Sequence, residues 1–145
     1  MVPGWSNNKL VIIGLDDKEY SLSLAKYSKS RPRCSALHKQ ARDLLHQLVG
    51  NINIFEEVPL LGTTKPPVIA DFLIPDLKLL VETQGQQHYE QNSLFHNDSL
   101  DFRKGQARDR LKVSWAEVNG FKLVALKYNE IDDWASQIKS AFAKD

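Results

Sequence analysis

Hydrophobic residues spaced like one face of a helix identify the first regular element of the chain. Leu37, Ala41, Leu44, Leu45 and Leu48 recur every three or four positions. Ser35 precedes this run and is a favourable N-cap residue, and Gly50 follows it, where glycine commonly ends a helix. We therefore predict an amphipathic helix of about 14 residues starting after the serine.

Runs rich in β-branched and other apolar residues predict strands on both sides of this helix. Before it, Lys9–Ile13 and Glu19–Leu24 surround the turn Gly14–Asp17 and predict a β-hairpin. Apolar residues on both faces of Val68–Ile74 and Leu79–Gln84 are typical of central strands that are covered on both sides. The strands predicted after the helix are Ile52–Leu61, Val68–Ile74, Leu79–Gln84 and Phe121–Tyr128.

Two more helices are predicted towards the C-terminus. A long helix over Ser99–Val118 has the apolar stripe Ala107, Leu111, Trp115 and Val118, and a terminal helix over 131–142 carries Trp134 and Ile138. Helices mixed with strands in this order predict an α/β sandwich rather than a helix bundle or a barrel. We expect residues 1–34 to form an N-terminal β-hairpin with a basic connector and residues 35–145 to form the main domain.

Length and composition limit the class of protein. A chain of 145 residues, with 42% hydrophobic and 26% charged residues, is typical of a single globular domain. One cysteine, Cys34, excludes a disulfide framework and a cysteine-based zinc ribbon. No apolar run reaches the about 20 residues of a membrane span, and the N-terminus lacks the features of a signal peptide. We therefore expect a cytoplasmic protein with no membrane partner.

The positive charge of the chain is unevenly distributed. Lys and Arg total 19 against 18 Asp and Glu, which argues against a generally polybasic protein. Eleven of the 19 positive residues lie within 26–42 and 103–112, where one acid opposes them. A single charged run is usually a solvated surface, but two runs around an acidic site favour binding to a phosphate backbone. The residues that we expect to contact DNA are Lys29, Arg31, Arg33, Arg103, Lys104 and Arg108.

The second predicted hairpin brings two acids together. If its centre lies between Asp76 and Leu77, Asp71 faces Glu82 on the next strand, and Gln84 lies on the same face as Glu82. Two carboxylates in an apolar sheet repel each other and lose solvation. A shared proton, a basic side chain or a divalent cation would relieve this cost, and oxygen ligands suit Mg²⁺ or Mn²⁺. The alternative is that both acids lie at exposed strand ends and are merely solvated.

The residues around these acids resemble a known nuclease motif. Ala70-Asp71-Phe72-Leu73-Ile74-Pro75, followed by Leu80-Val81-Glu82-Thr83-Gln84-Gly85-Gln86-Gln87-His88-Tyr89, is similar to the PD-(D/E)xK nuclease superfamily. Within it, the run resembles the very-short-patch-repair-like branch, which includes phage homing endonucleases. Asp109-Arg110-Leu111-Lys112 and Asn119-Gly120-Phe121 match later parts of the pattern. The resemblance implies a restriction-endonuclease-like αβββαβ core in which a central mixed sheet is flanked by helices.

The same resemblance implies a set of functional residues. Asp71 and Glu82 would bind Mg²⁺ or Mn²⁺, and Gln84 stands where the superfamily usually has lysine. His88 would act as a general acid or base, because the unperturbed pKa of histidine is close to neutral pH. His38 occupies about the place of the branch's glutamate on the first helix, and Glu57 or Glu56 is the other candidate for an additional acid.

A pair on the long helix has two interpretations. Asp109 and Lys112 are three residues apart, so they would either pair with each other or act at the site. In the second case Lys112 would reach a phosphate and Asp109 would orient His88.

We therefore expect a metal-dependent DNA endonuclease that hydrolyses phosphodiester bonds of double-stranded DNA, similar to site-specific phage homing endonucleases. Such a protein would act inside a bacterial host. The alternative is a non-catalytic DNA- or junction-binding module that retains the nuclease fold. A sugar hydrolase with a carboxylate pair fits less well, because aromatic residues do not cluster near the acids. One chain carries one candidate site, so cutting both strands would need a homodimer or two successive events.

Overall fold

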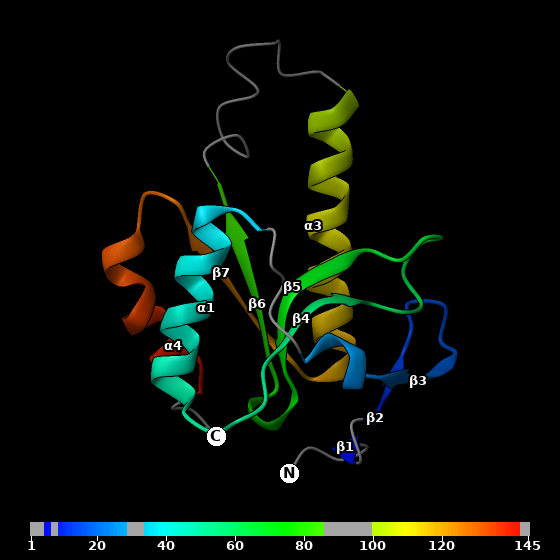
Figure 1. The fold of residues 1–145 in the computed structure, drawn as a ribbon. Coiled ribbons are helices and arrows are strands. Elements are labelled where there is room, and N and C mark those ends of the chain that lie inside the picture. Colours follow the sequence, from blue (N-terminus) through cyan, green and yellow to red (C-terminus); the bar gives the residue numbers. More distant parts are fainter. Residues whose placement is uncertain (1–4, 7–8, 29–33, 86–99, 143–145) are drawn as a thin grey trace.

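The computed structural model describes residues 5–6, 9–28, 34–85 and 100–142, and Figure 1 shows their arrangement. Within these residues, two sheets and three α-helices form the framework. The strands are β1 (Trp5–Ser6), β2 (Lys9–Ile13), β3 (Glu19–Ser23), β4 (Phe55–Pro59), β5 (Ile69–Ile74), β6 (Leu79–Gln84) and β7 (Lys122–Lys127). The helices are α1 (Ala36–Val49), α3 (Leu100–Asn119) and α4 (Trp134–Phe142), with short 3₁₀ turns at Ala25–Tyr27, Pro75–Leu77 and Ile131–Asp133.

Helix α1 begins and ends where the sequence predicts, after Ser35 and before Gly50. The Ser35 side chain accepts a hydrogen bond from the His38 backbone N–H at 3.0 Å, which satisfies one of the free donors of the first turn. The helix ends at Gly50, whose φ of +64° is a conformation that glycine adopts without a steric penalty. Its buried positions include Ala41 and Leu45, as the apolar spacing predicts, and also Val49, which the predicted stripe did not contain.

The central sheet has the strand order β4-β5-β6-β7. The first three strands are antiparallel neighbours, while β7 runs parallel to β6 after the long α3 crossover. In the β5–β6 hairpin, Phe72 pairs with Val81 and Leu73 with Leu80, which is the register expected from the sequence. Lys78, in the turn, has a φ of +52° and donates its backbone N–H to the Pro75 carbonyl.

Helices cover both faces of this sheet (Figure 1). On one face, α1 and α4 pack against a buried cluster that includes Phe72, Val81 and Trp134. On the other face, α3 contributes Trp115 to a cluster with Leu73 and Leu80. This arrangement confirms an α/β fold with a four-stranded mixed sheet flanked by helices.

The N-terminal strands form a second, three-stranded sheet with the order β1-β2-β3. Its β2–β3 hairpin is as predicted, and the short strand β1 was not predicted. Leu10, Ile12 and Leu22 are buried in the same core cluster as Trp115, so this sheet shares a core with α3 and the central sheet. Asn119 at the end of α3 accepts a hydrogen bond from the Ile13 N–H and donates one to the Ile13 carbonyl.

Three details of the sequence prediction were wrong. Strand β4 begins at Phe55 rather than Ile52, because the chain is still turning after α1 and the Ile52 N–H binds the Val49 carbonyl. Val118 is 51% exposed, since burial of both Trp115 and Ala116 turns the packed face of α3 away from it. Ile131 lies in a 3₁₀ turn before α4 and is 41% exposed.

Within the described ranges, the helices are all too short or too polar to span a lipid bilayer.

Candidate functional site

Asp71 on β5 and Glu82 on β6 are held together where the backbone ladder between these strands ends. The last paired residues are Phe72 and Val81, and the next step in this register is Asp71 opposite Glu82. At that step the side chains replace the backbone bonds. Glu82 Oε2 accepts the Asp71 N–H at 2.8 Å, and Asp71 Oδ2 accepts the Thr83 N–H at 2.8 Å and the Thr83 hydroxyl at 3.0 Å. Each carboxylate is therefore fixed against the strand that carries the other.

A lysine from α3 completes this group. Lys112 Nζ donates to Glu82 Oε1 at 2.6 Å, and the two side chains are only 13% and 10% exposed. Charge-assisted hydrogen bonds of this length are among the stronger polar contacts in proteins. The sequence left open three ways of relieving the repulsion between the two acids: a shared proton, a basic side chain or a divalent cation. In the structure the basic side chain of Lys112 fills this role. We use the name "acid site" for Asp71, Glu82 and Lys112.

The acid site perturbs the protonation of Glu82. Burial, together with the negative charge of Asp71, raises the pKa of Glu82 from 4.5 to about 7, although Lys112 and the Asp71 N–H act in the opposite direction. The Glu82 carboxyl group therefore changes from protonated to ionised near neutral pH. Any further cation that approached the two acids would favour the ionised form.

The remaining predicted site residues are placed as follows. Gln84 ends β6 two residues beyond Glu82, on the same face by strand alternation, and is half-buried. Glu57 is half-buried on β4 with a φ of +52°, between residues paired with Phe72 and Ala70, and so at the level of Asp71. Asp109 is half-buried on α3, one turn before Lys112.

The predicted DNA contacts and His88 are only partly described. Arg103, Lys104 and Arg108 are exposed on α3. His88, Lys29, Arg31 and Arg33 lie outside the described residues, so their proposed roles stay predictions.

A second buried polar group joins α1 to β4. Glu56 accepts hydrogen bonds from Arg42 Nε at 2.8 Å and Arg42 Nη2 at 3.0 Å, and its Oε1 lies 3.0 Å from His38 Nε2. The His38 ring stacks on Phe72 with 4.3 Å between ring centroids. Burial of the Glu56 carboxyl opposes its ionisation, but the hydrogen bonds from Arg42 and His38 outweigh this and lower its pKa.

The sequence pointed to His38 and Glu56 as candidate site residues but not to their contact with each other or with Arg42, which was counted with the surface positive charges. Arg42 is in fact buried, with 9% of its surface exposed. The signal was available: His38 and Arg42 are four residues apart and lie beside the apolar stripe of α1. Phe72, which contacts His38 and pairs with Glu56, directly follows Asp71, so this group supports β5 next to the acid site.

The donor set of the acid site suits a hard cation. Mg²⁺ is usually held by one or two carboxylates, with water and substrate phosphate completing its ligands. Asp71 and Glu82 supply two carboxylates on adjacent strands, whose oxygens would hold such an ion. In the part of the chain that the structure describes, no cluster of three or more His, Cys, Asp or Glu residues is arranged to bind a metal.

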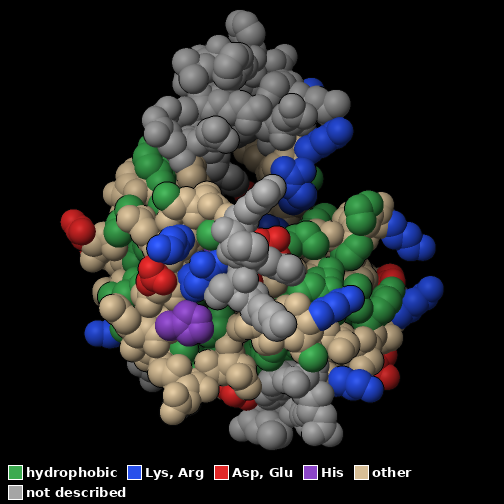
Figure 2. Space-filling view, viewed as in Figure 1, with side chains coloured by type: hydrophobic (Ala, Val, Ile, Leu, Met, Phe, Trp, Pro, Cys, Tyr) green, Lys and Arg blue, Asp and Glu red, His purple; other side chains and the backbone are tan. Residues whose placement is uncertain are grey.

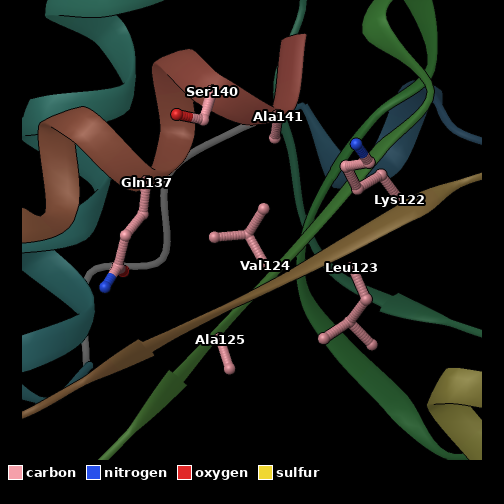
Figure 3. A pocket seen from close by; sticks show the side chains of 7 residues that line it. All are labelled: Lys122, Leu123, Val124, Ala125, Gln137, Ser140 and Ala141. Atoms are coloured by element: carbon pink, nitrogen blue, oxygen red, sulfur yellow. The ribbon is translucent and has the colours of Figure 1, made fainter. Parts of the chain in front are cut away.

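A shallow pocket elsewhere offers less chemistry. It lies between β7 and α4, and Figure 3 shows Val124 projecting between the two elements. Gln137 and Ser140 are its polar side chains on α4, and it contains neither an acid nor a histidine. The acid site therefore remains the best candidate for catalysis. The pocket is lined by Lys122, Leu123, Val124, Ala125, Gln137, Ser140 and Ala141.

Comparison with known proteins identifies a viral relative. The chain is 31% identical over 121 residues to the uncharacterized protein 094L of Frog virus 3 (isolate Goorha), covering 74% of this chain and 77% of the relative. The chain therefore belongs to the same family as this viral protein. No protein-family model matches the chain, and neither does any solved structure.

Proposed function

We propose that the protein is a metal-dependent DNA endonuclease that hydrolyses phosphodiester bonds at the acid site. The observation that carries this proposal is the convergence of Asp71, Glu82 and Lys112 from three elements of the fold. A buried carboxylate that faces a second acid costs stability, and such arrangements concentrate at functional sites. The PD-(D/E)xK resemblance supplies the reaction class, and it is this resemblance that leads us to a nuclease rather than another carboxylate enzyme.

The roles of the residues follow from their charges and positions. A bound Mg²⁺ or Mn²⁺ would lower the pKa of a water molecule and neutralise phosphate charge. Asp71 and Glu82 would hold the ion. Lys112 would provide the ammonium group that Gln84, in the usual lysine position, does not provide, and would stabilise the negative charge that develops on the phosphate. The Gln84 amide would orient a water molecule or a phosphate oxygen, and His88 would transfer a proton.

Cleavage of supercoiled plasmid DNA with and without Mg²⁺ tests the proposal. We expect metal-dependent nicking by the wild type and its loss in Glu82→Gln and Asp71→Asn, because each variant removes one anionic ligand. Lys112→Met should lower the cleavage rate by about 100-fold, as is typical when one preorganised charge donor is removed. Glu117→Gln, an exposed acid on the same helix as Lys112, is the matched control and should cleave like the wild type.

Absence of cleavage by the wild type with Mg²⁺ or Mn²⁺, on plasmid and on DNA from the native locus, would contradict this function. Cleavage that persists in Glu82→Gln would show that the acid site is not responsible. Since each chain carries one acid site, a double-strand cut should require a homodimer or two successive nicks. Light scattering together with a time course of nicked and linear plasmid distinguishes these two routes.

A non-catalytic DNA-binding module is the second candidate. The observation that favours it is the ion pair of Lys112 with Glu82, which compensates the charge of one acid without a metal. In addition, Gln84 stands at the motif position where the nuclease superfamily usually has lysine. For such a module we expect salt-sensitive DNA binding, no cleavage with any divalent cation, and no change in binding on Glu82→Gln.

A further inference from the structure

Helix α3 extends beyond the sheet against which it packs. Its 20 residues span about 30 Å, and Figure 1 shows its N-terminal half rising past the central strands. The C-terminal half is anchored, because Trp115 is fully buried and Asn119 binds the backbone of β2. The helix therefore presents part of one continuous face to the core and the rest of that face to solvent.

The solvent-exposed part of that face carries positive charge. On a helix with 3.6 residues per turn, Arg108, Lys112, Trp115 and Asn119 share one side, since they are separated by four, three and four residues. Trp115 is buried in the core and Lys112 contacts Glu82, so this side faces the acid site. Arg108 lies on the same side and is nevertheless exposed, as is Lys104 one turn earlier.

We propose that Lys104, Arg108 and Lys112 form a row that binds successive phosphates of one DNA strand and directs it to the acid site. This inference rests on the proposed function and adds the path of the substrate. Residues four apart on a helix are separated by about 6 Å along its axis, so the row is a ladder of cations leading to Glu82. Figure 2 shows Lys and Arg side chains over α3, above acidic atoms near the middle of this face.

The side chain of Arg108 fits this role. Its Nη2 lies 3.6 Å from the position that a Cβ atom would occupy on Gly105, so the guanidinium extends back along the helix beside a residue without a side chain. A guanidinium offers several N–H donors in one plane and binds phosphate oxygens in pairs. An exposed Arg next to a small residue can thus approach a backbone phosphate closely.

Exposed cations elsewhere on the molecule provide a matched control. Helical geometry places Arg110 on the side of α3 away from Trp115 and Lys112, and Lys139 lies on α4, over the other face of the central sheet. The double variants Lys104→Gln/Arg108→Gln and Arg110→Gln/Lys139→Gln therefore remove the same charge from different sides of the molecule. All four residues are exposed, so both variants should unfold at the temperature of the wild type.

Binding of a fluorescent DNA duplex in EDTA, measured by anisotropy at several salt concentrations, tests the row without requiring cleavage. Each lost phosphate contact reduces the slope of log K against log salt by about 0.9. We expect Lys104→Gln/Arg108→Gln to reduce the slope by about 2 and to weaken binding severalfold more than the control variant.

Equal effects of the two double variants would overturn the row, even if the wild type binds and cleaves DNA. Conversely, binding that depends on Lys104 and Arg108 without any metal-dependent cleavage would support the row and reject the endonuclease. If wild-type cleavage is observed, the row variant should cleave with a raised KM and a largely unchanged kcat. The control variant should keep both values.

Discussion

Glu82 illustrates how the environment of a single side chain determines its chemistry. The residue is buried, faces Asp71 and accepts a hydrogen bond from the ammonium group of Lys112. Neither the burial nor the lysine acts alone. Burial and the charge of Asp71 together prevail over the lysine, so the carboxyl keeps a raised pKa.

This raised pKa gives a prediction for stability in EDTA. Because the pKa of Glu82 is about 7 in the folded protein and 4.5 is its ordinary value, the folded protein binds more protons than the unfolded chain between these values. The stabilisation is fully present below pH 4.5 and is lost as the pH rises to about 7, by up to about 3 kcal/mol. Urea unfolding between pH 4.5 and 8 should show this loss in the wild type.

Glu82→Gln removes the titrating group and serves as the comparison. Its free energy of unfolding should depend less on pH over the same range, and an identical pH profile would contradict the assignment. Mg²⁺ should stabilise the wild type more at pH 8 than at pH 5, because protons compete with the cation for the carboxylates.

At the scale of elements, the contact of α1 with β4 depends on a buried charged group rather than on apolar residues alone. Glu56 is 2% exposed and is bound by Arg42 and His38 from successive turns of α1. Its neighbour Glu57 adopts a φ of +52°, which interrupts the regular alternation of β4 at the level of Asp71. The charged group and the irregular residue together shape the strand beside the acid site.

Removal of the Glu56 carboxylate should therefore be costly. Glu56→Ala removes the carboxylate that pairs with the buried Arg42 guanidinium, and such changes typically destabilise a protein by about 3–5 kcal/mol. Chemical denaturation measures this loss. Asp43→Ala, an exposed acid on α1, is the control and should stay within about 0.5 kcal/mol of the wild type. A loss below about 1 kcal/mol in Glu56→Ala would show that the group contributes little.

For the whole molecule, the main structural fact is a core shared by the N-terminal sheet and the central sheet. Leu10 and Leu24 are buried in the same cluster as Phe55 and Trp115. Gly14 and Gly62 approach so closely that a Cβ on Gly62 would lie 2.3 Å from the Gly14 Cα. Residues before and after position 34 thus contribute to one core, while the division at that position stays a prediction.

A shared core predicts cooperative unfolding. Leu10→Ala should destabilise the protein by about 2–5 kcal/mol, because it creates a cavity in contact with the main domain. Tryptophan fluorescence and far-UV circular dichroism should follow one transition, shifted as a whole. Val11→Ala, whose side chain is 43% exposed, should have little effect. Two separate transitions, with only the first shifted, would show that the N-terminal sheet unfolds independently.

The sequence by itself determined the elements whose signals are local. Periodicity and caps located α1, and the β5–β6 register followed from the length of the turn, so the opposition of Asp71 and Glu82 was predictable. The placement of Trp115 and Trp134 in the core was also predictable, because both lie on apolar stripes. The αβββαβ order of elements and the pairing of Lys9–Ile13 with the next strand were also predictable, because local sequence patterns indicate each element and the turn between the two strands.

Only the tertiary structure decided which distant charges meet. Lys112 is 30 residues from Glu82 and Arg42 is 14 from Glu56, and their spacing in the sequence carries no record of these contacts. The packing of α3 across the sheet sets the first contact, and the packing of α1 sets the second. The same packing divides the positive residues of α3 between a side that faces the acid site and a side that does not, which net charge cannot show.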